Sequence, residues 1–189
     1  KKFRFSKYTR AIDDSDSSIL SSLTSISMER RFVPSTTKSA TYNIAFNQKL
    51  NHPHAGHAYA ISSSKFTFNE KTTSYLDDDG NGNVRIYYIE SDGSRVVSDA
   101  TAGTVNYTTG LVKLNAFLPT AIDGSFLSIF AVPHENDVTA IRNQILLIAN
   151  AKVTIIDDVT TAVAATTATA TTTGVSTTVV DTGLYPVVY

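Results

Sequence analysis

The feature that most constrains this sequence is an alternation of apolar and polar residues, which recurs in short runs between turn residues. Residues 41–50 are an example. Their large apolar side chains, Tyr42, Ile44 and Phe46, fall on one side of an extended chain, and mostly polar residues fall on the other. A period of two residues is that of a β-strand with one buried face, whereas a helix repeats every ~3.6 residues. The chain is therefore predicted to be built mainly from strands.

Further strand-like runs are separated by short links that contain glycine. Such a link favours a hairpin, because glycine can adopt the left-handed conformation of a tight turn. Gly93 and Gly110 occupy two of these links, and residues 126–132 are apolar nearly throughout, as in a strand buried on both faces. These patterns predict antiparallel sheets in a sandwich-like body. The other predicted strands are 61–69, 84–90, 95–97, 104–107 and 111–114.

Two different patterns precede this β-rich part. Residues 1–12 alternate basic and aromatic side chains, which favours an edge strand or a protein contact over a nucleic-acid site in so neutral a chain. Residues 19–26 place aliphatic side chains on one stripe of a helix. Acidic residues at 13–16 precede this stripe and Pro34 follows it, as at the two ends of a helix. One helix is therefore predicted at about residues 16–31, within a mostly β chain of the α+β class.

The last part of the chain combines β-branched apolar runs with a long uncharged stretch. Residues 145–148 and 153–156 are predicted to be strands, although a helix at 137–149 also fits the first run. Residues 159–180 contain no charged side chain and consist mostly of Thr and Ala. We expect them to form an extended segment that packs on a partner or on the body. The predicted domains are 1–34 (strand and helix), 35–135 (antiparallel β domain) and 136–189 (β-rich assembly segment).

Charge and composition argue against several classes of partner. The formal net charge of −1 provides no field to hold nucleic acid, and no apolar run approaches the ~20 residues of a membrane helix. We therefore expect neither nucleic acid nor a membrane as a partner. The absence of cysteine removes disulfides, thiolate zinc sites and cysteine nucleophiles. Because the sequence starts without Met and without the apolar core of a signal peptide, a soluble fragment or a processed chain is expected.

Residues 77–83 resemble the start of a calcium-binding loop. Oxygen-bearing side chains occupy its first, third and fifth positions, and Gly82 occupies the sixth. The twelfth position is Tyr88 instead of a bidentate glutamate, and the predicted flanks are strands instead of helices. A polar β-turn is therefore favoured over a calcium site.

The histidines suggest a second metal site, which the surrounding sequence does not support. His52, His54 and His57 lie close together, but no carboxylate or thiolate at ligand spacing completes a four-coordinate zinc site. His134 and Glu135 lack the second histidine of the helical zinc-protease motif. Neither group is therefore predicted to bind a metal.

No complete catalytic motif is present. Gly80 and Gly82 lack the third glycine of a dinucleotide fingerprint, and there is no phosphate-binding loop or nucleophile elbow. Adjacent carboxylates such as Asp13–Asp14 and Asp157–Asp158 would point to opposite faces of a strand and could not flank one bond. The chain is therefore predicted not to be an enzyme, with no catalytic, cofactor-binding or metal-binding residue and no cofactor.

Several segments, taken in their serial order, resemble the C-terminal part of the baseplate wedge protein of T4-like phages, gene product six. The resemblance extends over about residues 15–160 and depends on the order of the segments, because none of them is a catalytic signature. The segments are Ser27–Pro34, Asp78–Tyr87 and Gly103–Gly110, followed by Asn136–Asp137 and Arg142–Leu146.

The resemblance implies a structural subunit of a contractile phage tail baseplate, made in the host cytoplasm and located in the virion. It further implies a wedge component that pairs with copies of itself, as a dimer in the inner ring, contacts other wedge and hub proteins, and rearranges when the sheath contracts. The alternative is a β-rich carbohydrate or cell-surface binding module of a tail fibre or adhesin. The absence of Trp weakens that alternative, and the nine Tyr leave it open. An enzyme such as a glycosidase fragment ranks third.

Overall fold

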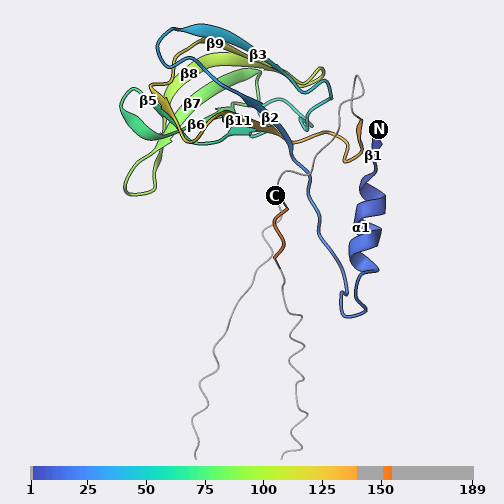
Figure 1. The fold of residues 1–189 in the computed structure, drawn as a ribbon. Helices are drawn as coiled ribbons and strands as arrows, with labels where there is room; N and C mark the ends of the chain where they lie inside the picture. Colours follow the sequence, from blue (N-terminus) through green and yellow to red (C-terminus); the bar gives the residue numbers. More distant parts are fainter. Residues whose placement is uncertain (1, 140–150, 155–189) are drawn as a thin grey trace, which may run out of the picture. The chain divides into compact units, whose positions relative to one another are not determined.

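The protein is described by a computed structural model, which covers residues 2–139 and 151–154 (Figure 1). The chain divides into two compact units, Lys1–Ile148 and Ala149–Tyr189. In the second unit, residues 151–154 have no regular secondary structure and are exposed. The strand predicted at 145–148, half of the one at 153–156, and the extended segment at 159–180 lie outside the described residues. Residues 153 and 154 are described and are not in a strand. The predicted domain limits after residues 34 and 135 stay predictions.

The described residues are mostly β-structure, as predicted, with one short helix near the amino terminus. Every strand pair is antiparallel. The helix is α1 (Phe5–Asp13), and the strands are β1 (Lys2–Phe3), β2 (Met28–Phe32), β3 (Ala40–Ala45), β4 (Ile61–Ser63), β5 (Phe66–Phe68), β6 (Lys71–Asp78), β7 (Asn83–Ile89), β8 (Arg95–Asn106), β9 (Leu111–Phe117), β10 (Ala121–Ile122), β11 (Leu127–Ala131) and β12 (Val138–Thr139).

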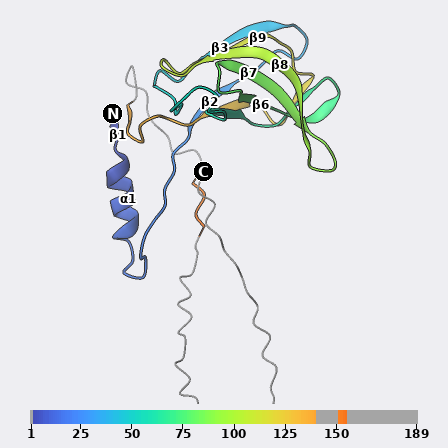
Figure 2. The ribbon, with the colours of Figure 1, turned by 180° about the vertical axis from the view of Figure 1, so that it is seen from behind.

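Ten of the strands form one strongly curved sheet. Its order is β2-β11-β4-β6-β7-β8-β9-β3, with β5 and β10 attached beside β6, and the run from β6 to β3 can be followed in Figures 1 and 2. The two edge strands, β2 and β3, meet through side chains: the rings of Phe32 and Tyr42 lie 5.0 Å apart. The amide of Ser35 also donates a 2.8 Å hydrogen bond to the Tyr42 hydroxyl. The sheet is therefore nearly a barrel, closed by side-chain contacts instead of a strand pair.

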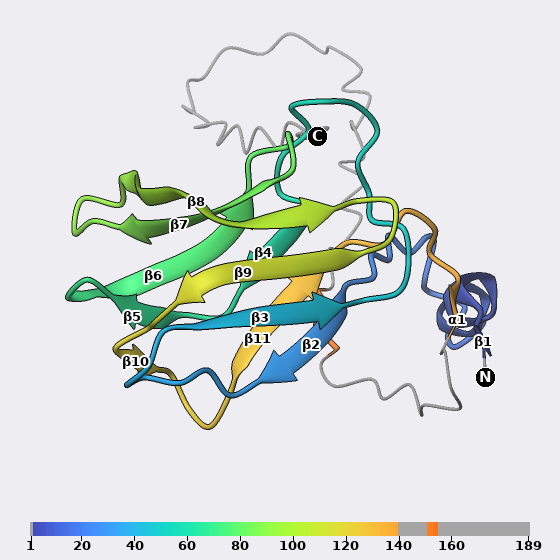
Figure 3. The same cartoon turned by 90° about the horizontal axis from the view of Figure 1, so that it is seen from above.

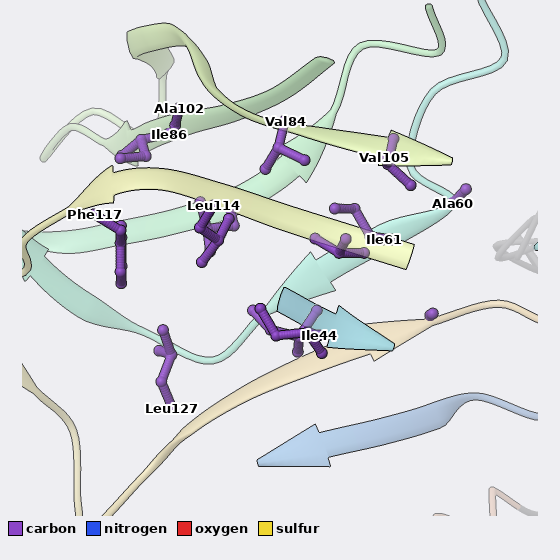
Figure 4. Close-up of a cluster of buried hydrophobic side chains, with 14 of the residues drawn as sticks. Ile44, Ala60, Ile61, Val84, Ile86, Ala102, Val105, Leu114, Phe117 and Leu127 are labelled. Carbon is purple, nitrogen blue, oxygen red and sulfur yellow. The ribbon is translucent and has the colours of Figure 1, made fainter. Parts of the chain in front are cut away.

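One hydrophobic core fills the inside of this sheet. It combines Ile44 of β3 and Leu114 of β9 with Ile61 of β4 and Leu127 of β11, so strands from opposite parts of the sheet order share it (Figures 3 and 4). The alternation in the sequence identifies most of these residues, because every second side chain of a strand points inward. The mostly β, antiparallel body expected from the sequence is thus confirmed, and the sandwich-like arrangement is formed by one sheet that curves into a near-barrel.

A bulge in β9 breaks the alternation at one point. Val112 and Leu114 are buried and the exposed Lys113 lies between them, but the next buried side chain is Phe117, not Ala116. Ala116 has φ of 46°, and the pairing of β9 with β3 shifts here. The inserted residue returns Phe117 to the core side of the sheet.

The amino-terminal helix was predicted in the wrong place. The structure has α1 at residues 5–13, where an edge strand was predicted, and β2 at residues 28–32, where the helix was predicted to end. Phe5, Tyr8 and Ile12 also fit a helical stripe, so both periods were present in the first stretch. The serine-rich residues 15–27 are poor helix formers, and pairing of β2 with β11 decides the second stretch.

The two predicted hairpins are present, with one difference. Gly93 (φ 84°) lies in the β7–β8 turn and Gly110 (φ 69°) in the β8–β9 turn. The runs at 95–97 and 104–107, predicted as separate strands, belong to the single strand β8, which crosses two irregularities in its pairing with β7. A long strand can bend at such irregularities and continue in the same sheet.

Candidate functional site

The calcium-like run 77–83 contains the end of β6 and the hairpin turn to β7. Its three carboxylates accept hydrogen bonds from groups of the same chain. Asp79 Oδ1 accepts hydrogen bonds from the amides of Asn81 (2.7 Å) and Asn83 (3.0 Å), and its Oδ2 accepts one from the Asn83 side chain (2.7 Å). Burial alone raises the pKa of Asp79, but these hydrogen bonds lower the pKa below its usual value. This is the polar turn that the sequence favoured.

The buried Asp78 ties three parts of the chain together. Its carboxylate accepts hydrogen bonds from the Ile61 amide (2.9 Å), the Gly80 amide (3.3 Å) and the Tyr107 hydroxyl (2.8 Å). Burial of the phenol and the neighbouring Asp78 raise the pKa of Tyr107 above its usual value. Asp78 therefore positions the turn, β4 and the β8–β9 hairpin relative to one another.

His52 completes this arrangement on the outside. Its ring stacks on Tyr107 at 3.7 Å between centroids, and its Nε2 donates a 2.8 Å hydrogen bond to the Gly80 carbonyl. His52 and Tyr107 line an open groove of about 720 Å³, together with Asn81, Asn106 and Lys113. The His54 and His57 rings contact each other edge to face at 5.3 Å. Within residues 2–139 and 151–154, no cluster of three His, Asp or Glu side chains is arranged to hold a metal ion.

A second cluster lies on the outer face of β6, β7 and β8, and we call it the tyrosine–arginine surface: Tyr59, Tyr75, Asp77, Arg85, Tyr87, Arg95 and Val97. Most of these residues belong to pairs that lie directly opposite each other on neighbouring strands. The two side chains of such a pair point to the same face of a sheet. Tyr75 is opposite Tyr87, and Asp77 is opposite Arg85. The alternate pair, Leu76 and Ile86, is buried in the core.

Asp77 holds the two arginines of this surface in place. Its buried carboxylate accepts a bidentate pair of hydrogen bonds from Arg85, at 3.1 and 3.0 Å, and another from Arg95 Nη2. The Arg95 guanidinium lies 3.9 Å from the centroid of the Tyr87 ring and donates a 2.7 Å hydrogen bond through Nη1 to the Tyr59 hydroxyl. Sequence reasoning missed this surface. The period-two spacing of Tyr75 and Asp77, and of Arg85 and Tyr87, would have revealed it once β6 and β7 were aligned.

The amino-terminal segment, residues 2–27, has little contact with the core. None of the residues of α1 is buried, and no aliphatic residue of the stretch after it is buried either. The side chains of Leu20 and Leu23 are 77% and 104% exposed. The segment is joined to the rest by the pairing of β1 with β12 and by a 3.0 Å hydrogen bond from the Phe5 amide to Asp137 Oδ1. No helix in the described part of the chain is long and apolar enough to cross a membrane.

This segment matches a baseplate family. Residues 1–31 match the family model of the baseplate structural protein gp6, C-terminal domain III. The resemblance in the sequence was expected to extend over about residues 15–160, so the match coincides with it only at residues 15–31. No match was found among curated proteins or among solved structures. The comparisons therefore connect the amino-terminal segment and most of β2, and not the rest of the β-rich body, to a baseplate structural protein.

Proposed function

We propose that this chain is a non-enzymatic structural subunit of a contractile phage tail baseplate, located in the virion. It acts as a wedge or inner-ring component through association with copies of itself and with other wedge and hub proteins. One coincidence carries the proposal: the residues that match a baseplate structural protein include Leu20 and Leu23, which are among the most exposed large apolar residues of the described chain.

Residues 2–27 gain little stability from packing on the protein's own core. A helix as short as α1 is marginal on its own in water, and most helical stability in proteins comes from packing an apolar face. Burying a leucine side chain stabilises a complex by roughly 1.5–3 kcal/mol, and Leu20 and Leu23 are available for this. A partner that covers them would supply the missing packing.

The absence of enzymatic activity is supported by how the acidic side chains are used. Asp77, Asp78 and Asp79 are the carboxylates that most resemble a functional cluster in the sequence, and each is engaged by arginines, amides or a tyrosine of the same chain. Their role is to hold β4, β6, β7 and the β8–β9 hairpin together. No carboxylate among them is left to act as a general acid or base.

The proposal is tested by changing the two exposed leucines to Asp in the full-length chain. We expect Leu20→Asp/Leu23→Asp to remain folded but to lose association with itself and with purified wedge proteins, measured by sedimentation velocity. Val33→Asp is the matched control, because Val33 is also exposed (69%) but lies outside the matched residues. Melting temperatures of both variants serve as the folding check.

Two outcomes would contradict the proposal. One is a wild-type chain that stays monomeric and binds no wedge protein. The other is a double-leucine variant that associates as well as the Val33→Asp control.

A further inference from the structure

We propose that the tyrosine–arginine surface is a docking site for the acidic turn Asp13–Asp16 of a second copy of this chain. The inference deepens the proposed self-association and depends on it, because it names the two patches that would meet. One patch lies on the outer face of β6, β7 and β8, and the other begins at the last residue of α1.

The receiving surface is preorganised. Asp77 and the Tyr87 ring hold Arg95 between them, and the Tyr59 hydroxyl accepts a hydrogen bond from the same guanidinium. Side chains that are already ordered lose little conformational entropy when a partner arrives. Tyrosine and arginine are also among the side chains most enriched in the energetically dominant residues of protein interfaces. Tyr59 is 62% exposed, so part of the surface remains free to make a contact.

The charges within this surface are not balanced. Two guanidinium groups, Arg85 and Arg95, share the one carboxylate of Asp77. The Arg95 side chain is 28% exposed, so a group from outside can approach part of it. Asp79 also acts on Arg85, but its oxygens are occupied by Asn81 and Asn83. A further carboxylate from outside would therefore be attracted to Arg95.

The acidic turn supplies carboxylates of the right kind. Asp13, Asp14 and Asp16 are all exposed, whereas Asp77 and Asp78 are buried and Asp79 is partly buried. The side-chain partners of the three exposed aspartates are the nearby groups Ser22, Arg10 and Ser18. Leu20 and Leu23 follow the turn and are exposed as well. The receiving surface offers an apolar counterpart, because Val97 lies opposite Tyr87 and is 44% exposed. Charge and apolar character therefore match between the two patches.

The two patches belong to different parts of the chain, and this determines the type of assembly. When one patch binds a different patch on the next copy, one patch of each kind remains free at the two ends of the assembly, so further copies can be added. Such head-to-tail contacts generate a closed ring if the rotation between copies closes, and an open filament otherwise. A contact of this type is therefore compatible with a ring-forming baseplate subunit.

The first experiment neutralises the acidic turn in the full-length chain. Asp13→Asn/Asp14→Asn/Asp16→Asn keeps the shape of the side chains, and we expect self-association to weaken about tenfold or more, with a flatter dependence on NaCl concentration. The control, Glu70→Gln/Asp123→Asn/Glu135→Gln, makes the same change in net charge at exposed positions elsewhere and should associate like the wild type. Sedimentation velocity over a range of salt concentrations measures both.

The second experiment tests whether the two patches meet. Val97→Glu adds a negative charge to the receiving surface without touching the core, and it should weaken association of the wild type strongly. In the chain with the neutralised turn it should have much less effect, because the repulsion that it creates requires the three aspartates. The melting temperature of Val97→Glu shows whether the fold is retained.

The outcomes separate this inference from the proposed function. If the acidic-turn variant behaves like its control, or if the two changes act additively, the docking site is wrong, while the result for Leu20 and Leu23 still decides the baseplate proposal. A monomeric wild type would overturn both. If Val97→Glu instead abolishes binding to an anionic glycan array and leaves association unchanged, the surface is a carbohydrate site and the docking proposal is wrong.

Discussion

Single residues in this protein show how a motif that resembles a ligand site can serve the fold. Asp78 has the sequence context of a cation ligand, yet its carboxylate is buried and accepts hydrogen bonds from β4, the following turn and Tyr107. A buried carboxylate requires such partners, because an unsatisfied charge in the interior is costly. Asp78 therefore stabilises the body. The loss of stability on mutating Asp78 depends on the groups that would be left without a hydrogen-bond acceptor.

At Gly110 we expect any side chain to be damaging, for two separate reasons. The residue has φ of 69°, and a Cβ atom there would approach the Gln48 carbonyl oxygen within 2.2 Å. Gly93 has a similar φ of 84°, but a Cβ atom there would meet nothing within 4 Å. Gly93→Ala should therefore cost about 1 kcal/mol and Gly110→Ala about 2–3 kcal/mol or more in urea unfolding. Equal costs would contradict the close approach at Gln48.

For Tyr107 we expect a loss of stability from removing the hydroxyl alone. Tyr107→Phe leaves the ring to stack on His52 but removes a donor to the buried Asp78, which should cost about 1–3 kcal/mol in urea unfolding at pH 7. Tyr42→Phe is a comparison, because Tyr42 loses only the hydrogen bond that it accepts from the Ser35 amide. A smaller loss from Tyr107→Phe than from Tyr42→Phe would contradict this role of Asp78.

The Tyr107 hydroxyl should make the free energy of unfolding depend on pH in the alkaline range. The folded state raises the pKa of Tyr107, so the neutral phenol is favoured in the folded protein. Its contribution to stability is therefore complete below the unfolded pKa of about 10 and is lost as the pH rises from there toward the folded pKa. The difference in unfolding free energy between the wild type and Tyr107→Phe should shrink above about pH 10. A difference that grows with pH would contradict the assignment.

Among the secondary-structure elements, partner strands override local preference. Residues 28–32 pair with β11 as β2, and their side chains add a 2.6 Å hydrogen bond from the Ser128 hydroxyl to Glu29 and a contact of Arg31 with the Phe126 ring. The Arg31 hydrogen bonds lower the pKa of Glu29, although burial opposes them. Ser128 and Phe126 lie about a hundred positions from β2 in the sequence, so no local pattern could have indicated their contacts with Glu29 and Arg31.

The bulge in β9 provides a test at the same scale. Ala116 has φ of 46°, which is sterically unfavourable for a residue with a Cβ atom and is not unfavourable for glycine. Ala116→Gly should therefore be neutral or stabilising by up to about 1 kcal/mol, whereas Lys113→Gly, in the regular part of the strand, should destabilise by about that amount. Thermal unfolding measures both. A clear loss of stability from Ala116→Gly would show that the bulge is not strained.

For the whole molecule, the two parts of unit one differ in how they use apolar residues. The body buries its alternating side chains in one core, and the amino-terminal segment leaves Leu20 and Leu23 exposed. A protein that works alone gains nothing from such exposure, whereas a subunit gains binding energy from it. The proposed structural role would use these exposed side chains as a contact for a partner.

We expect the stability of the whole chain not to depend on divalent cations. The oxygens of Asp77, Asp78 and Asp79 already accept hydrogen bonds from side chains and amides, and a cation would have to displace several of these. Addition of EDTA or of millimolar Ca²⁺ should therefore leave the melting temperature unchanged within about 1 °C. A shift of several degrees would indicate a bound ion, because a ligand that prefers the folded state stabilises it by mass action.

The sequence by itself determined the mostly β class, the hairpins at Gly93 and Gly110, and much of the core, because strand periodicity and turn geometry are local properties. Only the tertiary structure decided that residues 5–13 are helical, that residues 28–32 form β2, and that Tyr75, Asp77, Arg85 and Tyr87 share one outer face. For β2 and for the shared outer face, the deciding contact joins strands whose partners and register are not encoded in any single stretch. Strand pairing is non-local, so the surface proposed for docking emerges only when the sheet is assembled.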